Sequence, residues 1–250
     1  MSILRLTNVT KEFRIGDRRV RALDSIDFEL DHREVVALLG PSGAGKTTLL
    51  TIAGALQRPT SGTVEVAGIE VQDLSERELA KVRRNHVGFI FQSYNLLAAL
   101  TALENVQYML ELKGYRGKHA RERALGILDM MGMSHRANEL PKRLSGGEQQ
   151  RVAVARAFAS DGDLILADEP TANLDHERAT ELTKLLRALS RDLAVPVLMV
   201  THDFRSSQFA DRLLWLEDGH IKPISAGDVA AMAPPSVARP LSLEAEATSS

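Results

Sequence analysis

Residues 40–48 read Gly40-Pro41-Ser42-Gly43-Ala44-Gly45-Lys46-Thr47-Thr48 and decide the fold of this chain. An apolar run at residues 35–39 precedes them, and a mostly apolar run at residues 49–54 follows. This order predicts a strand, a phosphate-binding loop and a helix, although a glycine-rich turn with a solvated lysine is the alternative. The loop and the helix N-terminus would aim backbone N–H groups at a triphosphate. Lys46 would reach the β- and γ-phosphates, and Thr47 would hold Mg²⁺.

Length and composition limit the class of protein. At 250 residues, the chain predicts one domain with room for an inserted subdomain. A net charge of −2 provides no general basic field, so no nucleic acid is expected as a partner. The absence of cysteine excludes disulfides, zinc–thiolate sites and thiol catalysis. No apolar run approaches the roughly 20 residues of a membrane span, which predicts a chain that is soluble or held at a membrane by a partner.

The remaining pattern predicts an α/β fold with a mostly parallel sheet core, an antiparallel β subdomain and a helical subdomain. Residues 3–30 alternate between apolar and polar, residues 101–133 have helical spacing, and strands alternate with helices from residue 141. The predicted domain covers residues 1–225, with a helical subdomain at about 93–145 and a flexible tail at 226–250. Predicted helices start at Ser75, Ser145 and Glu177, and predicted strands cover 63–68, 87–91, 164–167 and 195–200, with a hairpin turn at Asp218-Gly219.

Polar residues follow several of the apolar strands. Gly40 ends the first, Gln92 follows residues 87–91, Asp168 and Glu169 follow residues 164–167, and His202 follows residues 197–201. Ligands of open α/β sheets collect beyond the carboxyl ends of the strands. The sequence therefore predicts an amide, two carboxylates and an imidazole near one phosphate loop.

Asp168 and Glu169 are neighbours at a strand end, where successive side chains point to opposite sides, so we expect them to have different tasks. Asp168 would face the phosphate loop and bind Mg²⁺ through water. Glu169 would polarise the water that attacks the γ-phosphate. The alternative is a pair of solvated acids that open a turn before Pro170.

His202 and Gln92 each have two interpretations. His202 would hydrogen-bond the γ-phosphate or the attacking water and hold Glu169, or it would cap the next turn. Gln92 would give its carbonyl oxygen to Mg²⁺ or orient water, or it would be a satisfied loop amide. Because Gln92 precedes the helical segment, a contact there would pass the nucleotide state to whatever that segment binds.

Residues 144–151, Leu-Ser-Gly-Gly-Glu-Gln-Gln-Arg, predict a second anion site. Ser145 and Glu148 form a capping box, while Gly146 and Gly147 leave the N–H groups of the first helical turn accessible. The chain therefore carries one predicted anion site at Lys46 and another at Ser145.

In this order and spacing, these motifs resemble the ATP-binding subunit of ABC transporters. The resemblance covers about residues 3–225 and includes the phosphate loop, the Leu-Ser-Gly-Gly-Glu stretch, the Asp-Glu strand and residues 173–175, Asn-Leu-Asp. It implies a P-loop ATPase of ABC type that converts ATP to ADP and phosphate with Mg²⁺. The residues it implies for catalysis are Lys46, Gln92, Glu169 and His202, and those for the metal are Thr47, Gln92 and Asp168.

The resemblance also implies a head-to-tail homodimer. ATP held by residues 40–48 of one copy would be closed over by Ser145, Gly146, Gly147 and Glu148 of the other. Asp175 would lie at the junction of the copies. Phe13 falls where the family places an aromatic ring against adenine, and its face is suited to stacking.

Residues 88–97, 103–106 and 141–151 are similar to the MacB/LolD/DevA group of that family. Its members serve lipoprotein release, macrolide or glycolipid export, and cell-division signalling. The similarity implies a separate transmembrane permease, a peripheral location on the cytoplasmic face of the cell membrane, and either export or transmembrane mechanotransmission. A groove near Gln92 and residues 94–103 would receive the permease's coupling helix.

Other functions share this chemistry. A soluble ABC ATPase of translation or DNA repair is one alternative. The single set of motifs and the spacing of about 100 residues between Lys46 and Ser145 argue against it, because such proteins usually carry two domains or a long coiled coil. The ATPase of an importer and a cargo-free regulator of a cell-division permease are further alternatives. The sequence leaves the cargo unassigned.

Overall fold

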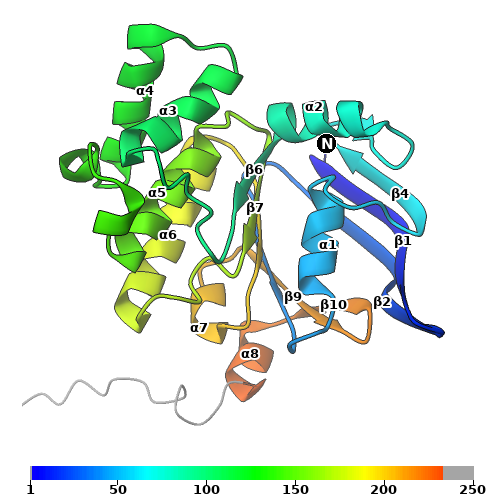
Figure 1. Ribbon diagram of the computed structural model, residues 1–250. Coiled ribbons are helices and arrows are strands. Elements are labelled where there is room, and N and C mark those ends of the chain that lie inside the picture. Colours follow the sequence, from blue (N-terminus) through cyan, green and yellow to red (C-terminus); the bar gives the residue numbers. More distant parts are fainter. Residues whose placement is uncertain (1, 233–250) are drawn as a thin grey trace, which may run out of the picture.

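Two sheets lie on either side of helix α1 in the computed structural model, which describes residues 2–232 (Figure 1). The antiparallel sheet has the order β2-β1-β4-β5, and the six-stranded sheet has the order β10-β9-β3-β8-β7-β6. The first sheet consists of β1 (Leu4–Ile15), β2 (Arg18–Leu30), β4 (Ser61–Val66) and β5 (Ile69–Glu70). The second consists of β3 (Val35–Leu39), β6 (Val87–Ile90), β7 (Leu164–Asp168), β8 (Val197–Val200), β9 (Arg212–Glu217) and β10 (His220–Ile224).

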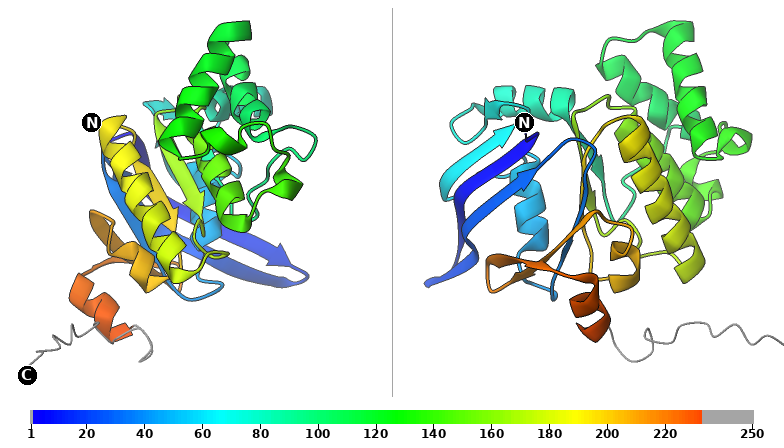
Figure 2. Two further views of the ribbon diagram at one scale, coloured as in Figure 1. Left: turned by 90° about the vertical axis from the view of Figure 1, so that its left-hand side faces the viewer. Right: turned by 180° about the vertical axis from the view of Figure 1, so that it is seen from behind.

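The six-stranded sheet is parallel from β9 to β6, and only β10 pairs with its neighbour in the antiparallel sense. Helices α3 and α4 extend beyond this sheet in both views of Figure 2. The helices are α1 (Lys46–Ala53), α2 (Glu76–His86), α3 (Ala102–Leu112), α4 (Gly117–Met130), α5 (Gly146–Phe158), α6 (His176–Asp192), α7 (Phe204–Ser207) and α8 (Ala226–Met232), with short 3₁₀ turns at Ser134–Arg136 and Pro141–Arg143.

Successive residues of the central strands face two separate cores. In β8, Val197 and Met199 pack beneath helices α3 to α6, whereas Leu198 and Val200 pack with α1 and the antiparallel sheet. Because both faces of such a strand are buried, its sequence is continuously apolar rather than alternating. The predicted strands at 87–91, 164–167 and 195–200 correspond to β6, β7 and β8 of this sheet, and the predicted strand at 63–68 corresponds to β4 of the antiparallel sheet, with ends shifted by at most two residues.

Local capping explains where several helices begin. The predicted starts at Ser75 and Ser145 are confirmed, since each serine forms a reciprocal cap with the glutamate three residues later. Thr101 caps α3 in the same way. The predicted hairpin turn is also confirmed, because Asp218 and Gly219 both have positive φ, at 49° and 78°.

Two predicted segments differ from the structure. The helical stretch at 101–133 divides into α3 and α4, which Gly114 separates in a left-handed conformation with φ 101°. The predicted tail begins instead with α8, whose start is capped by Ser225 and Asp228. The Ser225 N–H donates to the Asp228 carboxylate at 2.7 Å, and the Asp228 N–H donates to the Ser225 hydroxyl at 3.1 Å. Residues 233–250 of the predicted tail lie outside the described residues.

Candidate functional site

A cavity of about 450 Å³ opens at the carboxyl ends of β3, β6, β7 and β8. Most of the residues predicted for the site meet there, although they come from separate strand ends. Of the phosphate-loop residues, Gly40, Pro41 and Ala44 do not line it, and Ala22 of β2 is a lining residue that sequence reasoning missed. The lining consists of Phe13, Ala22, Ser42, Gly43, Gly45, Lys46, Thr47, Thr48, Gln92, Asp168, Glu169 and His202.

Lys46 begins α1 and folds back across the phosphate loop. Its ammonium donates hydrogen bonds to the carbonyl oxygens of Gly40 and Pro41 at 2.8 and 2.9 Å, and the residue is only 8 % exposed. Burial lowers the pKa of Lys46, while the carboxylates of Glu169 and Asp168 act in the opposite direction. The loop therefore holds a largely desolvated amine beside two carboxylates.

Gly45 shows why this loop needs glycine next to the lysine. Its φ is 102°, and a Cβ at this position would lie 2.4 Å from the carbonyl oxygen of Ala22. The backbone of β2 thus sets how closely the loop passes, and it also places Ala22 in the cavity. The sequence motif that identified the loop lies within residues 40–48, whereas the contact with Ala22 joins two segments that no sequence motif connects.

Asp168 and Glu169 face the same cavity but have different partners. The Thr47 hydroxyl donates to Asp168 Oδ1 at 3.4 Å, and Glu169 Oε2 lies 2.8 Å from His202 Nδ1. The alternation that predicted opposite sides ends here, because Glu169 follows the last residue of β7 and has φ 47°. Burial raises the pKa of Asp168 and the charge of Glu169 raises it further, opposed by Thr47 and Lys46.

The loop that carries Gln92 is held from two sides. The Asn173 side-chain amide donates to the backbone carbonyl oxygen of Gln92 at 2.9 Å. The Arg156 guanidinium donates to the backbone carbonyl oxygens of Tyr94, at 3.0 Å, and of Asn95. Burial lowers the pKa of Arg156. Sequence reasoning missed both anchors, because Asn173 lies 81 residues and Arg156 more than 60 residues from its partners in the loop.

The predicted second anion site does not belong to this cavity. The Glu148 N–H donates to the Ser145 hydroxyl at 3.3 Å, which caps α5, and a Cβ on Gly146 would lie 3.0 Å from the Tyr94 hydroxyl. One chain therefore does not bring the two anion sites together. The site at α5 opens into a cavity of about 250 Å³ lined by Ser145, Gly147, Glu148, Arg151, Leu174, Arg178, Glu181 and Leu182.

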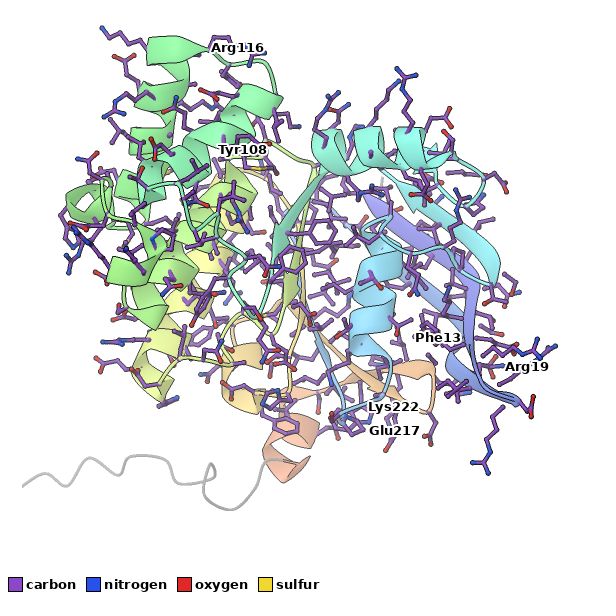
Figure 3. The ribbon with its side chains drawn as sticks, in the orientation of Figure 1. Phe13, Arg19, Tyr108, Arg116, Glu217 and Lys222 are labelled. Atoms are coloured by element: carbon purple, nitrogen blue, oxygen red, sulfur yellow. The ribbon has the colours of Figure 1, made fainter. Side chains whose placement is uncertain are left out.

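Phe13 supplies the aromatic surface of the first cavity. It belongs to β1 (Figure 3), and its residue partner on β2 is Val20. The Lys11 ammonium lies 5.3 Å from the centre of its ring. A flat heterocycle can stack on such a ring at the rim of the cavity.

A strand, a phosphate loop and a helix at the carboxyl edge of a mostly parallel sheet define a P-loop nucleotide-binding domain. The family model described as ABC transporter matches residues 23–172, and the chain belongs to that family. Within residues 2–232, no helix combines the length and the apolar character needed to cross a membrane.

Several relatives match most of the chain. MJ0796 of Methanocaldococcus jannaschii, an uncharacterised ABC transporter ATP-binding protein, is 43 % identical over 225 residues, which cover 88 % of this chain and 95 % of that protein. The lipoprotein-releasing system ATP-binding protein LolD of Colwellia psychrerythraea is 39 % identical over 234 residues, covering 94 % and 91 %. The macrolide export ATP-binding/permease protein MacB of Burkholderia pseudomallei is 44 % identical over 219 residues, covering 88 % of this chain and 33 % of MacB. The chain thus spans about a third of that relative.

A solved structure gives the same fold. The dimeric post-hydrolysis state of MJ0796, bound to ADP and Pi, superposes with a TM-score of 0.83 at 40 % identity, covering 89 % of this chain and 98 % of that one. Together these findings identify an ATP-hydrolysing, ATP-binding motor subunit of the ABC transporter type, related to MacB and LolD.

Proposed function

We propose that two copies of this chain close head to tail over ATP at the cytoplasmic face of a membrane and drive a permease carried on a separate chain. The work is either export or transmembrane mechanotransmission. The observation that carries the proposal is the separation of the two anion sites, since Lys46 and Ser145 belong to different cavities of one chain. A second copy supplies the missing half of each site. MJ0796 is dimeric in its solved structures, which supports pairing of two copies.

The oxygen donors of the first cavity fit Mg²⁺. Thr47 brings a hydroxyl, Asp168 a carboxylate and Gln92 a side-chain carbonyl, and Mg²⁺ prefers such hard oxygen ligands. The first two groups already lie 3.4 Å apart. When bound, the ion would neutralise charge on the phosphates as the bond to the γ-phosphate breaks.

The chain's own groups divide the hydrolytic work. Glu169 accepts a proton from the attacking water, and His202 holds the Glu169 carboxylate through its ring nitrogen at 2.8 Å and its backbone N–H at 3.3 Å. Lys46 exchanges the carbonyl oxygens of Gly40 and Pro41 for phosphate oxygens, with which its charge forms stronger hydrogen bonds.

Replacing Ser145 by arginine in a Glu169→Gln background tests the composite site. Arginine removes the hydroxyl that caps α5 and fills the smaller cavity. We expect ATP-induced dimerisation, measured by light scattering, to need at least about 100-fold more ATP, as expected when charge-assisted contacts to phosphate are lost. The affinity of the monomer for ATP, measured with a fluorescent nucleotide, should not change, because Ser145 does not line the cavity of Lys46.

Ser75→Arg is the matched control, because Ser75 forms the same reciprocal cap at the start of α2. The control protein should dimerise normally. A dimer that persists in the Ser145→Arg protein, or one lost equally in both proteins, contradicts the head-to-tail arrangement.

We propose an apolar groove of about 330 Å³ as the docking site of the permease. It is lined by residues of α2, β6, α3 and α5, whereas the sequence-based hypothesis places the docking site near Gln92 and residues 94–103. Leu56 and Leu112 in its wall are 47 % and 42 % exposed, and exposed apolar clusters mark interaction sites. Phe91 lines the groove and directly precedes Gln92, so an occupant would touch the loop that reaches the ATP cavity. The other lining residues are Arg83, Arg84, Val87, Gly88, Phe89, Met109, Arg156, Ala157 and Ser160.

Leu112→Asp should remove the permease from this groove. We expect at least a tenfold lower yield of permease when the tagged variant, carrying Glu169→Gln, is purified from detergent-solubilised membranes in ATP and analysed by mass spectrometry, since a buried unpaired carboxylate is strongly unfavourable. The matched control is Leu193→Asp, because Leu193 is 45 % exposed and lines a different apolar cavity.

The identity of the recovered protein separates the alternatives. A permease with a large extracytoplasmic domain supports the export or mechanotransmission role. Recovery of an importer permease contradicts the export role and supports an ATPase that drives import. Recovery of only ribosomes or DNA-repair proteins contradicts the membrane assignment. Equal loss of permease in both aspartate variants contradicts the groove.

A further inference from the structure

Helix α2 presents a row of basic side chains on one face. Arg77, Lys81 and Arg84 occupy positions i, i+4 and i+7, which lie above one another on a helix, and all three are exposed. We call these three residues the α2 basic row. Its residues take no part in the ATP cavity or in the cavity at α5.

The charge of one nearby acid, Glu78, acts on the row at Lys81. None of its three side chains forms an ion pair with a described carboxylate, and Arg84 hydrogen-bonds only the neutral side chain of Asn85, at 3.2 Å. Both acids of the same helix also have partners outside the row. Glu76 pairs with Arg58 at 3.6 Å, and Glu78 accepts the Ser75 N–H in the helix cap. The positive charge of the row is therefore directed outward.

The row is continuous with the groove proposed for the permease. Arg84 belongs to the row and also lines that groove. In Figure 3, nitrogen-tipped side chains leave the upper side of α2, and the exposed Arg116 lies at the same upper edge of the molecule. If a membrane-embedded permease occupies the groove, this edge faces the membrane surface around it.

We propose that the α2 basic row binds anionic lipid headgroups next to the permease. This inference rests on the proposed docking groove. Each lysine or arginine close to an anionic bilayer strengthens binding about fivefold, and the attraction extends over roughly 8–10 Å at physiological salt. Guanidinium groups also match phosphate oxygens in a bidentate geometry. Because the whole chain has a net charge of −2, attraction to an anionic surface requires such a local row.

Vesicle sedimentation tests the proposal on the full chain. The probes are vesicles of phosphatidylcholine alone and of phosphatidylcholine mixed equally with phosphatidylglycerol. We expect binding only to the mixed vesicles and loss of binding at high salt. The Arg77→Gln/Lys81→Gln variant should bind about 25-fold more weakly, because each of the two lost charges accounts for about a factor of five.

Two variants make the result specific. Arg18→Gln/Arg19→Gln removes the same charge at the β1–β2 hairpin, where Arg19 is 81 % exposed, and should bind like the unaltered chain (Figure 3). Arg77→Lys/Lys81→Arg keeps both positive charges and should bind the mixed vesicles as tightly as the unaltered chain. Equal loss in the hairpin variant, equal binding to both kinds of vesicle, or no binding to either overturns the proposal. ATP-induced dimerisation is measured without vesicles, so its failure is a separate result.

Discussion

A Glu169→Gln substitution should lower the rate of ATP hydrolysis about 10³-fold, within the range that a lost general base costs. Glutamine keeps the size of the side chain but cannot accept the proton of the attacking water. His202 fixes the orientation of the Glu169 side chain, because its Nδ1 lies 2.8 Å from Glu169 Oε2. ATP binding depends on other groups of the cavity, so we expect ATP to bind normally. Because the bound ATP is not cleaved, it should hold the dimer closed. Phosphate release at saturating ATP and light scattering measure the two effects.

An Asp168→Asn substitution is the informative comparison for this result. It removes the carboxylate proposed to hold Mg²⁺ beside Thr47, so it should weaken binding of ATP with Mg²⁺ rather than trap a dimer. Glu177→Gln, an exposed position at the start of α6, controls for loss of charge alone. A Glu169→Gln protein that hydrolyses ATP at the normal rate, or stays monomeric at saturating ATP, contradicts the assignment of the base.

A Lys46→Ala substitution should weaken ATP binding about 100-fold, which corresponds to the loss of one or two charge-assisted hydrogen bonds to phosphate. Lys46 is the only lysine or arginine among the described residues that line the cavity. Its loss also removes the lysine charge that offsets those of Asp168 and Glu169 in the cavity. Calorimetric titration of the variant with ATP and Mg²⁺ measures the affinity.

Lys113→Ala provides a matched control for this substitution. Lys113 also donates to two carbonyl oxygens, those of Asn85 at 2.7 Å and Asp161 at 3.2 Å, and burial lowers its pKa as well. It lies outside the ATP cavity, so Lys113→Ala should lower the thermal unfolding midpoint and leave ATP affinity unchanged. Normal ATP affinity in the Lys46→Ala protein, or an equal loss in both proteins, contradicts the role of Lys46.

Local patterns in the sequence predicted most of the elements and the centre of the site. A phosphate loop, a capping box and a hairpin turn depend on residues a few positions apart, so residues 40–48, Ser145 with Glu148, and Asp218-Gly219 were recognisable before folding. Continuous apolar runs revealed the strands that are buried on both faces. Because the carboxyl ends of parallel strands meet at one edge, Gln92, Asp168 and His202 could be assigned to one place.

Contacts between distant segments could not be predicted in this way. The approach of Gly45 to Ala22, the Arg156 bonds to the Gln92 loop, and the groove between α2 and α3 join residues whose spacing carries no periodicity. The left-handed backbone at Glu169, which brings both carboxylates into one cavity, is likewise a property of the folded loop.

The sequence by itself determined the class of fold, the phosphate loop and the set of groups available for hydrolysis, because each depends on residues that are close together in the chain. Only the tertiary structure decided which of these groups share a cavity. It places Lys46 with Glu169 and keeps Ser145 apart, because packing of α5 against the sheet sets the distance between the two anion sites. That separation is the physical reason why a second copy is needed to complete the proposed site.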